Sequence, residues 1–201
     1  MNTLFKDSLT KSYTYTAYRK LVTDLLRKGK STGPHQSDEL TDYSKLNDHR
    51  MNRLDKTLQL TPASISCLKS LNKKYIWLVI SEGWCGDAAQ ILPILNKMAE
   101  ETVHIDLQIV LRDENETLMN AYLTNGGRSI PKLIVIDAET GEETGNWGPR
   151  PAEASQLIND LKNQYGGITD EVKEGLQKWY NDNKGIAVQE DILKLLKNSV
   201  L

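Results

Sequence analysis

One cysteine, Cys85, lies where the sequence favours chemistry. It follows residues 75–81, an apolar run rich in β-branched and aromatic side chains that is typical of a buried strand. From residue 87 onward apolar residues recur at helical spacing, which places Cys85 in the first turn of a helix. Unpaired N–H groups and the positive end of the helix dipole favour a thiolate there. Cys85 is therefore a candidate nucleophile that works with a single sulfur.

Asp87 acts against ionisation of this thiol. A carboxylate suits the first turn of a helix, where it accepts hydrogen bonds from backbone N–H groups. At about 6 Å from a thiolate, however, it opposes ionisation by about 0.7 kcal/mol in water and about 3 kcal/mol at an effective dielectric of 20. The sequence leaves open which effect is larger. It also leaves open whether Asp87 is only a helix-capping residue.

The surrounding pattern predicts an α/β protein. Between residues 61 and 165 the expected order is helix, strand, helix, strand, helix, strand, strand, helix. The strands are expected at 75–81, 103–111, 132–137 and 143–147, and helices at 62–71, from 87, at 114–123 and around 154–161. We expect an N-terminal helical extension over 1–60, with helices at 18–26 and 41–60, the second capped by Thr41, and a helical tail over 166–201. The tail is expected to pack on the same chain, with partner binding as the alternative.

Composition limits the partners. The chain has 201 residues, with 25 Lys and Arg against 27 Asp and Glu, so its net charge of -2 predicts no binding to nucleic acid or to anionic membranes. No stretch approaches the roughly 20 apolar residues of a membrane helix, and no secretory leader is recognised. The two cysteines fit a reducing compartment, so a cytoplasmic location is expected. The three histidines are scattered, and no metal or cofactor is expected.

Two motifs together carry a family resemblance. Trp84-Cys85-Gly86 ends a strand and opens a helix, and Ser129-Ile130-Pro131 precedes a strand and hairpin. With this order of elements, residues 61–165 resemble the thioredoxin-like family. The resemblance implies a three-layer sandwich with a mixed central sheet, here carrying N-terminal and C-terminal helical extensions.

The resemblance also implies a substrate groove beside the cysteine. In the family a cis proline, here Pro131, lies against the active cysteine, so Ile130 and Pro131 would border a groove that receives an extended substrate. The candidate substrate-binding residues are Trp84, Gly86, Asp87, Ile130, Pro131, Trp147 and Gly148. Arg128 and Arg150 flank this groove, either to hold a carboxylate or as solvated surface residues.

The chain departs from the family pattern at three positions. The second redox cysteine is replaced by Ala88, the proline between the two cysteines by Asp87, and the buried acidic residue by Val79. These departures argue against an ordinary dithiol cycle.

The other cysteine, Cys67, does not supply the missing sulfur. The helix that carries it and the following strand are expected to run antiparallel from a shared turn, with Cys67 only about 8 Å from that turn and Cys85 more than about 25 Å from it. A disulfide needs Cα atoms within about 7 Å. We therefore expect Cys67 to be a small buried apolar residue.

Two functions remain open. The first is monothiol thiol–disulfide exchange, in which Cys85 is catalytic, the partner is a protein or small-thiol disulfide, and an external thiol such as glutathione resolves the adduct. The alternative is a redox-inactive module whose groove binds an extended peptide or a partner protein. A third hypothesis, ranked lower, makes the added helices an assembly surface.

Overall fold

A four-stranded mixed sheet forms the centre of the molecule. The computed structural model describes residues 1–200, with side chains up to Lys197. The strands β1 (Tyr75–Ser81), β2 (Ile105–Leu111), β3 (Lys132–Asp137) and β4 (Glu143–Trp147) stand in the order β2-β1-β3-β4. Strand β1 is parallel to β2 and antiparallel to β3, and β4 is antiparallel to β3. The predicted mixed central sheet is confirmed.

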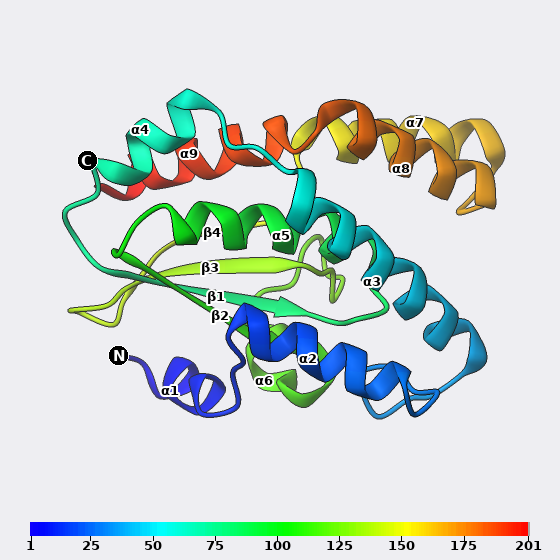
Figure 1. Ribbon diagram of the computed structural model, residues 1–201, viewed down its shortest axis with the longest axis horizontal. Helices are drawn as coiled ribbons and strands as arrows, with labels where there is room; N and C mark the ends of the chain where they lie inside the picture. The colour runs from blue at the N-terminus through cyan, green and yellow to red at the C-terminus, as the bar shows by residue number, and fades with distance from the viewer. Residues whose placement is uncertain (201) are drawn as a thin grey trace.

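Helices cover both faces of the sheet. In Figure 1, α1 (Thr3–Leu9), α2 (Tyr15–Leu26) and α6 (Glu116–Ala121) lie on one side, and α4 (Pro62–Lys69), α5 (Gly86–Glu100) and α9 (Ile186–Val200) on the other. The remaining helices are α3 (Asp38–Thr57), which packs on α5, and α7 (Ala152–Tyr165), which packs on α8 (Asp170–Asn183). In the described residues, no helix is both long and apolar enough to cross a membrane. The three-layer arrangement is the one expected.

Several element boundaries differ from the sequence prediction. Helix α3 is capped by Ser37, whose Oγ accepts a hydrogen bond from the Leu40 N–H at 3.1 Å, and not by Thr41, which lies inside the helix. Strand β2 begins at Ile105 and not at the predicted Val103, which is 88% exposed and lies outside the sheet. Helix α6 is shorter than predicted, because residues 112–114 form a 3-10 turn before it. Helix α1 was not predicted, since its seven residues are too few to show a period.

The C-terminal tail packs on the core, as expected. Gln189 of α9 is fully buried, and its Oε1 accepts hydrogen bonds from the Thr61 N–H at 2.8 Å and from the Ser64 hydroxyl at 2.9 Å. At the other side of α9, the Trp147 indole N–H donates to Asp191 at 3.2 Å. Polar groups buried in this way must be paired, so they fix the position of α9 on α4 and β4.

Replacing Gln189 by leucine tests how firmly the tail is held. The variant removes the acceptor of the Thr61 N–H and one of the partners of the Ser64 hydroxyl, so we expect the free energy of unfolding to fall by about 3 kcal/mol. Urea denaturation measures the change. Gln156→Leu is the control, because Gln156 is exposed on α7, where its amide donates a hydrogen bond to the exposed Asp160. A loss below about 1 kcal/mol for Gln189→Leu would contradict this account.

Candidate functional site

Cys85 lies at the junction of β1 and α5, one position earlier than predicted. It is the N-cap of α5, and its Sγ accepts a hydrogen bond from the Ala88 N–H at 3.5 Å. The thiol donates to the carbonyl oxygen of Ile130 at 3.3 Å. With 8% of its surface exposed, the cysteine is a buried group at the floor of the site.

The loop before β3 approaches this thiol as the resemblance implied. The Ile130–Pro131 peptide bond is cis, and Ile130 is buried beside Cys85. Gly148 lies directly against this loop, since a Cβ atom at that position would stand 2.4 Å from the carbonyl oxygen of Pro131. Its φ of +114° is also one that glycine alone adopts readily. The Gly148–Pro149 bond is cis as well.

Asp87 forms a buried cluster with two residues from distant segments. Its Oδ2 lies 2.6 Å from a terminal nitrogen of Arg150, and its Oδ1 accepts a hydrogen bond from the Tyr180 hydroxyl at 2.8 Å. Asp87 is 6% exposed, so it is not an ordinary solvent-facing helix cap. Tyr180 comes from α8 and was not predicted as a site residue. The sequence feature that could have identified Tyr180 is its spacing of four and eight residues from Leu176 and Val172, which form the buried stripe of that helix.

These surroundings keep the thiol protonated. Burial raises the pKa of Cys85 to about 12, and the negative charge of Asp87 contributes to the rise. The N–H groups of Ala88 and Asp87 and the charge of Arg150 act in the opposite direction but are weaker. The sequence left this competition open, and the structure resolves it in favour of burial together with Asp87.

The cluster also changes its other two members. Burial, followed by the Asp87 carboxylate, raises the pKa of Tyr180 above its ordinary value. Burial alone would lower the pKa of Arg150, but its hydrogen bond to Asp87 raises it overall. Both groups therefore keep their protons, and Asp87 accepts from two fixed donors.

A cleft of about 520 Å³ opens above Cys85. Four of the predicted residues, Trp84, Gly86, Asp87 and Ile130, line it together with Cys85. The guanidinium of Arg112 lies over the Trp84 ring, 4.7 Å from its centre. The cleft is also lined by Glu39, Leu40, Tyr43, Arg50, Arg128, Ser129, Pro149, Arg150, Lys173, Leu176 and Gln177. Residues of α3 and α8 therefore form walls of the cleft, and the junction between β1 and α5 forms its floor.

Three predicted residues do not line the cleft. Pro131 and Gly148 lie against each other outside its lining. Trp147 points to α9, where it hydrogen-bonds with Asp191. Cys67 is half-buried on α4 and lies in a different pocket, beside Leu71 and Leu196, so it packs on the core but is less buried than predicted. A surface helix exposes one side even of its small apolar residues.

A second buried carboxylate lies close to the motif. Val79 is buried in β1, as the missing family acid implied, but Glu82, three residues before Cys85, is also fully buried. Its oxygens accept hydrogen bonds from the Thr32 hydroxyl and, at 3.0 Å, from the Asp113 N–H. Burial raises the pKa of Glu82. This carboxylate joins the N-terminal linker to the end of β2 and does not contact the thiol. No cluster of metal-ligating side chains occurs among the described residues.

The chain is similar to a known protein family and to two solved structures. A family model described as thioredoxin matches residues 33–162, and the match therefore starts before α3. A crystal structure of a protein of unknown function from Pseudomonas aeruginosa is similar, with 18% identity and a TM-score of 0.57, covering 94% of this chain and 99% of that one. An HIV epitope-scaffold is similar at 19% identity and a TM-score of 0.54, covering 92% and 98%. At such identities the likeness shows the fold alone. None of the curated proteins matches the chain.

The Asp87→Asn variant tests the electrostatic account of the thiol. Removing the charge lowers the pKa of Cys85, so we expect alkylation by iodoacetamide at pH 8 to become about tenfold faster. The wild-type rate should rise up to pH 10 without a plateau, since the thiol is protonated throughout that range.

Both measurements use a Cys67→Ser background, so that Cys85 is the one thiol whose alkylation is measured. Asp160→Asn, on the exposed side of α7, is the charge-matched control and should leave the rate unchanged. A wild-type midpoint near pH 7 would contradict the account.

Proposed function

Because this chain belongs to the thioredoxin family, we propose that it uses the family groove to bind an extended peptide or a segment of a partner protein. In this function Cys85 is an uncharged residue at the floor of the groove. The observation that carries the proposal is the Asp87–Arg150–Tyr180 cluster, in which Asp87 stands where the family has the proline between its two cysteines. It holds a negative charge beside a buried thiol, and Ala88 offers no resolving sulfur.

The lining of the cleft suits such a ligand. Its volume of about 520 Å³ is in the usual range for binding sites. Trp84, Leu40 and Leu176 provide apolar contact, while arginine side chains provide hydrogen-bond donors. An extended chain presents alternating side chains and backbone groups, and a cleft of mixed polarity can satisfy both.

Monothiol exchange through Cys85 is the second candidate, and one observation favours it. The sulfur accepts the Ala88 N–H at the start of α5, a contact that stabilises a thiolate. In this reaction Cys85 first loses its proton. The thiolate then attacks a protein or small-molecule disulfide, one partner sulfur leaves as a thiolate, and a mixed disulfide remains. A second external thiol, such as glutathione, would then attack that bond and regenerate Cys85.

Cys85→Ser separates the two functions. The serine hydroxyl can donate to the Ile130 carbonyl as the thiol does, so the walls of the cleft are preserved. We expect wild type and variant to bind the same members of an octapeptide library, with affinities equal within about twofold. Neither protein should accelerate the reduction of hydroxyethyl disulfide by glutathione. Fluorescence anisotropy measures binding, and thiol release measures turnover.

Cys67→Ser serves as the matched control for cysteine removal. Loss of peptide binding in Cys85→Ser but not in Cys67→Ser, together with a trapped mixed disulfide in wild type, would establish the monothiol reaction instead. Absence of peptide binding by the wild-type protein would refute the proposed function.

A further inference from the structure

Two side-chain nitrogens converge beside Cys85 from opposite walls of the cleft. Arg50 comes from α3 and Gln177 from α8. A Cβ atom placed on Gly86 would lie 3.7 Å from Nη1 of Arg50 and 3.7 Å from Nε2 of Gln177. Both are hydrogen-bond donors, so the space in front of Gly86 faces two donors at once.

Other side chains orient these two donors. Nη1 of Arg50 donates one hydrogen bond to Oδ1 of Asn47 at 3.0 Å, and Asn47 donates in turn to the Gly83 carbonyl at 3.0 Å. Nε2 of Gln90 donates to Oε1 of Gln177 at 2.9 Å, which leaves the amide nitrogen of Gln177 on the side of Gly86. A ligand would find donors that need little reorganisation, which favours binding.

Arg50 differs from the other basic residues of the cleft in having no acidic partner. Four of them have a carboxylate within 4.0 Å. They are Arg112 with Asp113, Arg128 with Asp113 and Glu116, Arg150 with Asp87, and Lys173 with Asp170. Among the side chains that the structure describes, none forms an ion pair with Arg50. The acidic residues of the cleft lining are Asp87, which is held by Arg150, and Glu39, which lies eleven residues earlier on α3, roughly 16 Å along the helix axis.

The guanidinium of Arg50 is also partly removed from water. Burial, and then the positive charge of Arg53, lower its pKa. A partly buried cation without a counter-ion gains when an anion binds, and the bonds to a charged acceptor are stronger than neutral ones. The site thus favours a negatively charged acceptor.

We propose that Arg50 and Gln177 form a subsite for a carboxylate of the peptide that occupies the cleft beside Cys85. This proposal rests on the proposed function and adds the chemistry of the ligand, which is an acidic peptide. The carboxylate comes from an Asp or Glu side chain or from the C-terminus of the peptide. The subsite also gives the helices outside the sheet layer a role, since α3 and α8 each supply one donor.

Peptide binding by Arg50→Gln tests the subsite. The probe is a random octapeptide library in two forms, one with free and one with amidated C-termini. We expect peptides bound by wild type to be enriched in acidic groups, and the affinity of the best of them to fall at least tenfold in Arg50→Gln. In Gln177→Glu, a carboxylate of similar shape replaces the amide that donates the hydrogen bond, and its negative charge repels the carboxylate of the peptide. We expect a similar loss of affinity.

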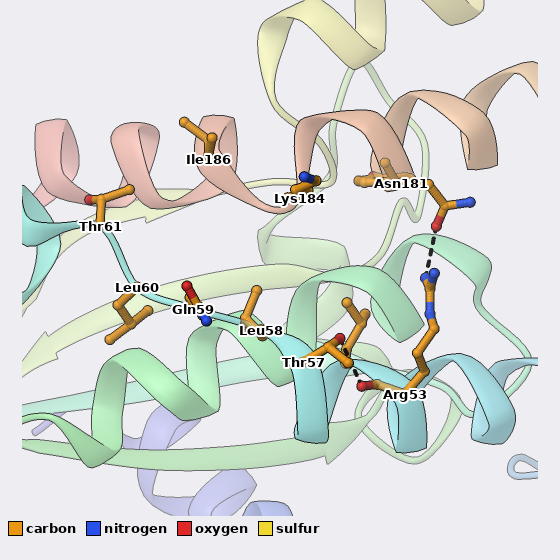
Figure 2. A pocket seen from close by; sticks show the side chains of 11 residues that line it. Arg53, Thr57, Leu58, Gln59, Leu60, Thr61, Asn181, Lys184 and Ile186 are labelled. Atoms are coloured by element: carbon orange, nitrogen blue, oxygen red, sulfur yellow. Dashed lines mark hydrogen bonds between the residues drawn. The ribbon is translucent and has the colours of Figure 1, made fainter.

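Arg53→Gln is the matched control. Arg53 is on the same helix but lines a different pocket, where it donates to Asn181 at 2.7 Å (Figure 2). This variant should bind acidic peptides like wild type. Enrichment in the amidated library identifies a side-chain acid, and enrichment confined to the free-acid library identifies the C-terminus.

Three results would contradict these proposals, and they can be told apart. Binding of peptides without preference for an acidic group, unchanged in Arg50→Gln, would overturn the subsite and leave the proposed function standing. Equal losses in Arg50→Gln and Arg53→Gln would also overturn it, since the effect would then come from net charge. Failure of wild type to bind any peptide would refute both proposals.

Discussion

The ion pair between the buried Asp87 and the partly buried Arg150, completed by the Tyr180 hydroxyl, is the interaction on which the site depends. A carboxylate with 6% exposure is stable only when it is paired and hydrogen-bonded, so its partners cannot leave without a large cost. Arg150 precedes α7 and Tyr180 lies on α8, and the cluster therefore ties both segments to the start of α5. The position of the cleft walls follows from this pairing.

The same cluster redirects the chemistry of the cysteine. In a helix N-cap the backbone N–H groups favour a thiolate, and Cys85 retains that geometry. Burial and the charge of Asp87 nevertheless outweigh it, so the pKa of the thiol rises. The thioredoxin fold thus keeps its cis proline loop, here beside a thiol whose pKa is raised by burial and by Asp87.

Helices outside the sheet layer form walls of the cleft. Helix α3 packs along α5 and brings Arg50 over Gly86, and Asn47 fixes it to the strand–helix turn. Glu82 has a similar role, since it links Thr32 of the N-terminal linker to the 3-10 turn that follows β2. Residues before and after the sheet therefore contribute to the site as directly as the motif itself.

The sequence by itself determined the sheet, its main helices and the place of Cys85, because these depend on local periodicity and on residue types at a strand–helix turn. It also indicated the cis bond before Pro131 through the family resemblance. Only the tertiary structure decided that Asp87 is buried with Tyr180, that Trp147 faces α9, and that Arg50 and Gln177 meet beside Gly86. The residues brought together in this way lie up to 127 positions apart in the sequence, as do Arg50 and Gln177, which both approach Gly86. No local pattern encodes how α3 and α8 pack, so both the outcome at the thiol and the unpaired charge of Arg50 depend on tertiary packing.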